Sequence, residues 1–275
     1  MRTACAVLLC AISLAGCSST RETPTGPTQP GPPANLPPAS AVVGISLLGD
    51  MWIPTTSAFV QMTARLVTRN EPFEYTLATD GVTWSIEPAG VAQIDQQGRV
   101  TPVSIGTATV TARYGDRTGI NPIRVLPDYS GNWSGQFRIT GCTGGHDFRE
   151  CGRMMAGAGA GNGTGTAASP FYPFSLALAQ FRDQVTGTVR EPRASGDLVY
   201  PVTGIVRLGG QLVIEANVPR ANSEPLRIFN WSSTANAGVT ILSGAFTKIE
   251  PYRTSFDEPY TIRTEHEFSG VTRTP

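Results

Sequence analysis

The chain has few of the side chains that enzymes use to move protons or hold metals. It contains only two histidines, His146 and His266, and a single lysine, Lys248. Neither the Gly-x-Ser-x-Gly turn of serine hydrolases, nor the His-Glu-x-x-His zinc motif, nor a Cys-x-x-Cys pair occurs in it. We therefore expect a protein that is not an enzyme and that has no cofactor and no metal site.

The chain also lacks an excess of either charge. It has 21 basic and 21 acidic residues, so its formal net charge at pH 7 is zero. Nucleic acids and anionic bilayers attract proteins through a large positive field, which equal numbers of the two charges do not produce. The sequence therefore predicts no nucleic-acid partner.

No apolar run reaches the ~20 residues that a membrane-spanning helix requires. The run at residues 4–14 follows the basic Arg2 and is typical of an export signal. It ends at Leu14-Ala15-Gly16-Cys17, which resembles the lipobox of bacterial lipoproteins. The resemblance implies that residues 1–16 are a signal peptide, that Cys17 is lipidated, and that the membrane is a partner through this anchor. The alternative is an ordinary secretory signal, which leaves a free thiol at the new N-terminus.

The residue after the lipobox bears on location. By resemblance to lipoprotein sorting in Gram-negative bacteria, Ser18 in place of Asp implies the outer membrane, on either its periplasmic or its extracellular face. Several acyl chains, at ~0.8 kcal/mol for each buried CH₂ group, would hold the chain there permanently.

The remaining cysteines form an even set. Cys5 and Cys10 leave with the signal and Cys17 is taken by lipid, so Cys142 and Cys151 remain. In an exported protein, an even remainder predicts a disulfide, here closing a short loop.

Residues 17–40 are expected to be a tether. Seven prolines lie between residues 18 and 40, and almost nothing there could build a core. Such a stretch is extended and polyproline-like, reaching at most roughly 70 Å at ~3.1 Å per residue. A docking peptide for a partner's aromatic groove is the alternative.

Residues 41–126 alternate apolar and polar side chains between turn residues, which predicts antiparallel strands in a sandwich of two sheets. Three motifs then follow in order: Val82-Thr83-Trp84, the hairpin from Val91 to Val100, and the strand from Gly106 to Ala112. They resemble the group 2 bacterial Ig-like domain, a fold that does not specify a function. The loop at residues 70–79 departs from that family because it is aromatic and bulky. Its Phe73 and Tyr75 are candidate contacts for a partner. Trp84, by contrast, occupies an inward-facing position of its strand, which predicts that it packs in the core.

Residues 127–275 contain eight strand candidates separated by short polar turns, which favours an antiparallel meander, or a barrel if the meander closes. The opening Gly131-Asn132-Trp133 resembles the first strand of lipocalin-like and avidin-like barrels. The resemblance implies that Trp133 closes one end and stacks with a basic residue from the last strand, Arg263 or Arg273. Such a lumen is either filled by side chains or able to hold a small apolar ligand, and we favour the filled one. Trp133 is also a candidate contact.

A long insertion, residues 141–170, separates the first two strands of this domain. It holds the Cys142–Cys151 loop, with His146 and Asp147 inside it, and a Gly-rich run. Long loops at a barrel mouth often carry function, so we expect partner contacts here, at His146 and Asp147. The triplet Glu265-His266-Glu267 cannot chelate a metal as a unit, because alternate strand residues point to opposite faces.

The sequence as a whole predicts an all-β, non-enzymatic, surface-anchored lipoprotein that displays an Ig-like and a barrel-like module for adhesion or ligand binding. Its partner would be a protein or a glycan. A lipocalin-like carrier of a small apolar molecule is the first alternative. An enzyme, the second, would need a cleft that joins His146 or His266 to acidic residues.

Overall fold

The structure is a computed structural model that describes residues 36–69, 74–145, 148–156, 171–193, 196–220, 223–235, 239–253 and 258–274. Two sets of strands, each around its own hydrophobic core, make up this part of the chain.

The first set forms three small sheets, ordered β1-β4-β5, β2-β10-β9-β6 and β3-β8-β7, after a short 3-10 turn, Ala39–Ala41. All pairs are antiparallel except β2 with β10. The strands are β1 (Val42–Leu48), β2 (Trp52–Pro54), β3 (Val60–Gln61), β4 (Thr63–Thr68), β5 (Tyr75–Ala78), β6 (Thr83–Glu87), β7 (Ala92–Ile94), β8 (Arg99–Pro102), β9 (Gly106–Tyr114) and β10 (Arg117–Leu126).

Alternation builds the core of these sheets. In β9, Ala108, Val110 and Ala112 are buried, while the threonines between them face outward or lie partly buried. Trp84 in β6 is also buried, and its indole N–H donates to the carbonyl oxygen of Thr79 at 2.9 Å. The core role that the sequence predicts for Trp84 is therefore confirmed.

The turn between β7 and β8 requires glycine. Gly98 has φ +76°, and a Cβ there would lie 2.7 Å from the carbonyl oxygen of Met62. A side chain at this position would meet both a left-handed backbone and a close carbonyl.

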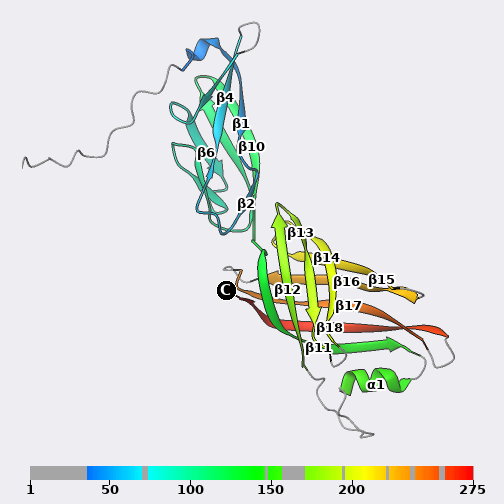
Figure 1. Ribbon diagram of the computed structural model, residues 1–275. Helices are drawn as coiled ribbons and strands as arrows, with labels where there is room; N and C mark the ends of the chain where they lie inside the picture. Colours follow the sequence, from blue (N-terminus) through cyan, green and yellow to red (C-terminus); the bar gives the residue numbers. More distant parts are fainter. Residues whose placement is uncertain are drawn as a thin grey trace, which may run out of the picture. The chain divides into compact units, whose positions relative to one another are not determined.

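The second set is a closed antiparallel barrel in which each strand pairs with its neighbours in sequence and β18 returns to pair with β11. Figure 1 shows these strands following one another, with the helix α1 (Phe148–Ala156) beside β11. The strands are β11 (Gly131–Gly144), β12 (Phe171–Phe181), β13 (Gln184–Glu191), β14 (Leu198–Val206), β15 (Leu212–Arg220), β16 (Ser223–Ala235), β17 (Ile241–Arg253) and β18 (Pro259–Thr274).

Aromatic side chains fill the middle of the barrel. Trp231 stacks on Phe246 with ring centroids 4.7 Å apart, and it lies 4.8 Å from Phe268 and 6.1 Å from Phe174. Rings in these offset and tilted arrangements add to the free energy gained by burial alone. This part of the lumen is therefore packed, as expected, although a cavity remains at one end of the barrel.

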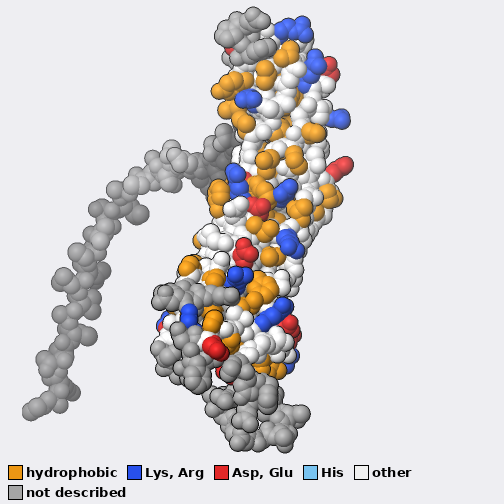
Figure 2. Space-filling view, turned by 90° about the vertical axis from the view of Figure 1, so that its right-hand side faces the viewer, with side chains coloured by type: hydrophobic (Ala, Val, Ile, Leu, Met, Phe, Trp, Pro, Cys, Tyr) orange, Lys and Arg blue, Asp and Glu red, His pale blue; other side chains and the backbone are white. Residues whose placement is uncertain are grey.

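The all-β fold class, with Ig-like sheets followed by an antiparallel barrel, is confirmed. The expected meander does close. Its last strand, β18, pairs with its first, β11, so neither strand has an unpaired edge. On the face seen in Figure 2, basic and acidic side chains are interspersed, in keeping with their equal numbers.

Candidate functional site

A cavity of about 390 Å³ lies within the barrel at the end that α1 adjoins. Its wall comes from β11, β12, β13, β17, β18, α1 and the segment that follows β13. The lining residues are Phe137, Ile139, Met154, Tyr172, Pro173, Glu191, Pro192, Arg193, Lys248, Glu250, Tyr252, Ile262, Thr264 and His266.

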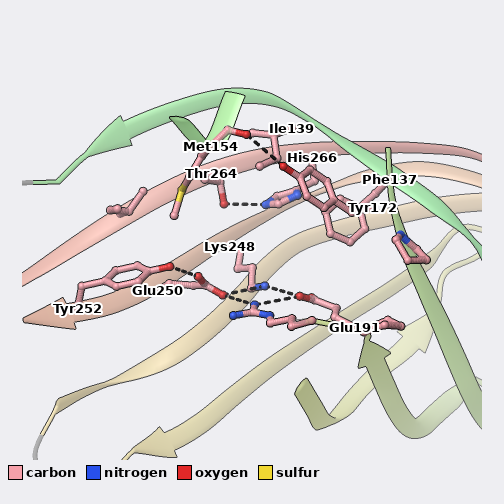
Figure 3. A pocket seen from close by; sticks show the side chains of 14 residues that line it. Phe137, Ile139, Met154, Tyr172, Glu191, Lys248, Glu250, Tyr252, Thr264 and His266 are labelled. Carbon is pink, nitrogen blue, oxygen red and sulfur yellow. Dashed lines mark hydrogen bonds and ion pairs between the residues drawn. The ribbon is translucent and has the colours of Figure 1, made fainter. Parts of the chain in front are cut away.

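One side of the cavity is a network of four charged groups (Figure 3). The Lys248 ammonium lies 2.7 Å from Glu191 Oε2 and 2.9 Å from Glu250 Oε1. The Arg193 guanidinium contacts the same two oxygens, at 3.1 and 2.7 Å. Each carboxylate therefore bridges both cations, and the four charges cancel.

Two tyrosines complete the network. The Tyr200 hydroxyl donates to Glu191 Oε1 at 2.6 Å, and the Tyr252 hydroxyl donates to Glu250 Oε2. Every oxygen of the two carboxylates thus has a donor. A buried charge is tolerated when it is paired and hydrogen-bonded in this way, so the network can persist in the barrel.

The network keeps its acids ionised. Burial alone would raise the pKa of Glu191, but Lys248, Tyr200 and Arg193 together lower it. The same balance between burial and the two cations holds the pKa of Glu250 far below its usual range. Arg193 shows the converse effect: the two carboxylates beside it raise its pKa, although partial burial opposes this and 35% of its side chain remains exposed.

The opposite side of the cavity is mostly apolar. Figure 3 places Ile139, Met154 and Tyr172 across from the charged network. Tyr172 stacks on Phe137 with centroids 5.6 Å apart, and its hydroxyl donates to the carbonyl oxygen of Met154 in α1 at 3.3 Å. The cavity therefore has one ionic and one apolar wall.

His266 lies between aromatic rings at the apolar side. It stacks on Phe246 with centroids 4.4 Å apart and meets Phe137 edge-on at 4.9 Å. Burial, together with the charge of Lys248, lowers its pKa to about 3, so the imidazole is neutral near pH 7. Its Nε2 shares a hydrogen bond with Thr264 Oγ1 at 2.6 Å, whereas the buried Nδ1 has no partner among the described residues.

The charged network was not predicted from the sequence, although the strands carry a signal for it. In β17, Leu242, Phe246, Lys248 and Glu250 are all buried, so two charged residues continue an apolar face. In β13, Glu191 continues the face of Val185 and Val189 in the same way. The signal for this site is therefore a charged residue at an inward-facing position of a strand, and no sequence motif marks it.

The other end of the barrel is closed by Trp133. Its side chain is fully buried, and its indole N–H donates to the carbonyl oxygen of Tyr129 at 2.9 Å. The Arg273 guanidinium lies 4.8 Å from its ring centroid and donates to the carbonyl oxygen of Asp128. Of the two arginines expected at this position, Arg273 is the partner, whereas Arg263 lies over Phe229. Because Trp133 has no exposed surface, it offers nothing to a partner outside the barrel.

The predicted disulfide between Cys142 and Cys151 is present and joins the end of β11 to α1. The Tyr260 hydroxyl also donates to Glu150 of α1, at 2.8 Å. These links hold Met154 at the cavity. A helix within the insertion was not expected from the sequence.

The remaining predicted residues have different outcomes. Tyr75 is 62% exposed on β5, and Arg65 lies 5.5 Å from its ring centroid. Cys17, Phe73, His146 and Asp147 lie outside the described residues.

The triplet at residues 265–267 alternates as expected. His266 is buried, and the exposed Glu265 and Glu267 lie on the outer face of the barrel. His266, Glu191 and Glu250 all line the cavity, so the structure does join a histidine to acidic residues, which is the arrangement that the enzyme alternative needs. Every oxygen of those two carboxylates already has a donor, however.

Within the described ranges, no group of three or more His, Cys, Asp or Glu side chains is arranged to hold a metal ion. No helix among these residues is long and apolar enough to cross a membrane.

Comparison with known proteins finds a family model that matches one part of the chain. Residues 60–120 match the bacterial Ig-like domain (group 2). The Ig-like domain therefore lies within the range 41–126 in which its motifs occur, and the match includes all three of them.

Solved surface-layer structures give weaker matches. The S-layer protein rSbsC(31-844) is 13% identical, with a TM-score of 0.27, over 85% of this chain and 40% of its own. Domains 4–9 of surface layer protein SbsC are 12% identical, with a TM-score of 0.26, over 82% of this chain and 43% of theirs. The chain thus spans less than half of either structure, and superposition at this level says nothing about function. No curated protein sequence matches the chain significantly.

Proposed function

We propose that the chain is a non-enzymatic lipoprotein, held at the outer membrane through Cys17, whose barrel binds a small ligand. The observation that carries the binding role is the cavity of about 390 Å³ beside α1. Ligand pockets typically measure about 300–1,000 Å³ and combine apolar walls with a few polar groups, as this cavity does. Eight-stranded barrels are wide enough to hold one small ligand. Binding in the lumen favours the carrier alternative over pure display.

A cavity-filling variant tests ligand binding. The full-length chain is titrated with two environment-sensitive fluorophores, neutral prodan and anionic 1-anilinonaphthalene-8-sulfonate. We expect at least one of them to bind saturably. Ile139→Trp places a large ring in the cavity wall and should abolish that binding, whereas Val199→Trp, on the exposed outer face of β14, should leave it unchanged. Binding that survives Ile139→Trp would contradict a site in the lumen.

Mass spectrometry of the mature N-terminus tests the anchor. We expect a chain that begins at an acylated Cys17. An unmodified Cys17, or residues retained before it, would contradict the anchor and leave the barrel's binding role untouched.

Adhesion to a protein or glycan remains a second role, and the Ig-like domain supports it. Tyr75 and Leu77 project from the same face of β5, with 62% and 54% of their surface exposed. Exposed aromatic side chains are common at binding surfaces. The double variant Tyr75→Ser with Leu77→Ser should reduce binding of the full-length chain to arrayed glycans or proteins. Ile120→Ser, at an exposed position of β10, serves as the control. Equal loss in both variants would contradict a contact at β5.

A further inference from the structure

The charge balance of the cavity limits what can enter it. Lys248 and Arg193 contribute two positive charges, and Glu191 and Glu250 contribute two negative ones. The four groups pair only with one another and with the Tyr200 and Tyr252 hydroxyls among the contacts described above. The ionic wall is therefore satisfied before any ligand arrives.

A charged ligand would disturb this balance. An anionic ligand that paired with Arg193 or Lys248 would leave a carboxylate of the network without its cation. A cationic ligand that paired with Glu191 or Glu250 would leave an ammonium or guanidinium group without its carboxylate. Leaving a charge unpaired in a buried site is strongly unfavourable. The His266 imidazole is neutral near pH 7 and supplies no compensating charge. An uncharged ligand avoids the penalty.

His266 adds a neutral polar side chain to the apolar side of the cavity. Its Nε2 is shared with the Thr264 hydroxyl, and its Nδ1 is buried without a partner among the described residues. The residues on this side therefore bring no ionised group to the ligand that could offset a charge on it.

The apolar wall, opposite the charged network, favours a ligand that is itself mostly apolar. Phe137, Ile139, Met154, Tyr172 and Ile262 present aromatic and aliphatic surface to the same space. Burying apolar area against them contributes roughly 25 cal/mol for each Å².

We propose that the cavity takes an electrically neutral, largely apolar molecule. This inference rests on the proposed binding role of the barrel and adds the chemical class of its ligand. It excludes fatty-acid anions and amine cations as the preferred occupants.

A series of probes with one ring system tests the class. The full-length chain is titrated by calorimetry at pH 7 with 2-naphthol, the 2-naphthoate anion, the 2-naphthylmethylammonium cation and naphthalene. We expect the two neutral probes, 2-naphthol and naphthalene, to bind at least tenfold more tightly than either ion. An ion that binds as tightly as 2-naphthol would overturn the inference.

A variant of the network gives the matched test. Glu250→Gln keeps the shape of the side chain and leaves one positive charge in excess, so the ratio of 2-naphthoate to 2-naphthol affinity should rise at least tenfold. Glu267→Gln, at an exposed position of β18, should leave the ratio unchanged. An unchanged ratio in a folded Glu250→Gln chain, checked by circular dichroism, would overturn the inference. If Glu250→Gln does not fold, the order of affinities in the unmodified chain decides.

The two proposals fail in different ways. If 2-naphthoate binds most tightly and Ile139→Trp abolishes that binding, the barrel is a ligand-binding module and only the neutral class is wrong. If none of the four probes nor either fluorophore binds, both proposals fail.

Discussion

Lys248 shows how a buried charge becomes part of a core. Only 3% of its surface is exposed, and its ammonium pairs with the carboxylates of Glu191 and Glu250. A buried ion network contributes little to stability compared with a well-packed apolar replacement of the whole set, but removing one member leaves the others unpaired. The network is therefore sensitive to single substitutions.

Replacing Lys248 with methionine should be strongly destabilising. Lys248→Met keeps the aliphatic stem but leaves two buried carboxylates with only Arg193, so we expect the free energy of unfolding to fall by about 3–5 kcal/mol. Urea denaturation measures the change. Arg138→Gln removes an exposed ion pair with Glu267 and should cost less than about 1 kcal/mol. Equal costs for the two variants would contradict a buried network.

His266 should make the protein sensitive to mild acid. Its pKa is about 3 in the folded chain against an ordinary value of 6.5, so below pH 6.5 the unfolded chain takes up the proton first. Stability is then lost as the pH falls, by about 2 kcal/mol between pH 7 and pH 5. Glu191 and Glu250 have lowered pKa values and lose their contribution only below their ordinary range near pH 4.5, which leaves this window to His266.

The matching variant is His266→Phe, which keeps a ring beside Phe246. Urea denaturation at pH 7 and pH 5 should show a loss smaller by about 2 kcal/mol than in the unmodified chain. The same loss in both chains would mean that His266 is protonated in the folded barrel.

At the scale of elements, the disulfide holds α1 against the barrel beside the cavity. Cys142 and Cys151 are nine residues apart, and their bond fixes the helix that presents Met154 to the cavity. In the chain-entropy account, closing so short a loop stabilises by about 2–3 kcal/mol.

Removing the disulfide should loosen α1 selectively. In a Cys142→Ser, Cys151→Ser chain we expect faster amide hydrogen exchange over residues 148–156 and weaker probe binding in the cavity. Exchange in the barrel strands away from α1, such as β14, should change little. Chemically reduced chain of unchanged sequence provides the control, because it should behave like the double variant. Unchanged exchange at α1 would show that packing alone holds the helix.

The strands themselves were largely predictable, and the site was not. Alternation predicted all eight barrel strands. The structure lengthens several of them, most clearly the strand predicted at residues 226–231, which is β16 (Ser223–Ala235), and the one predicted at residues 260–268, which is β18 (Pro259–Thr274). Counting cysteines gave the disulfide. Glu191 and Lys248, however, lie 57 residues apart and meet only because the closure and register of the barrel bring β13 and β17 to one lumen. Local sequence patterns do not contain that register.

At the scale of the whole molecule, the two sets of strands have separate cores. Trp84 belongs to the core of the Ig-like domain and Trp133 to that of the barrel. Each is nearly or fully buried, so truncating either removes many packing contacts within its own core.

Truncating each tryptophan should therefore destabilise one domain at a time. Trp84→Ala should lower the protection of amides in residues 42–126, and Trp133→Ala that of residues 131–274, each by about 3–5 kcal/mol. Hydrogen exchange followed by mass spectrometry separates the two ranges, and each variant is the control for the other. Equal loss of protection in both ranges would mean that the domains unfold as one unit.

The buried position of the only lysine also decides how this protein meets chemical reagents. All other basic side chains are arginines, so a folded chain offers no lysine amine on its exterior to acylating dyes or cross-linkers. A reagent then reaches Lys248 only through the cavity or when the barrel opens. The rate at which this amine reacts therefore reports how accessible the cavity is, and a bound ligand should slow it.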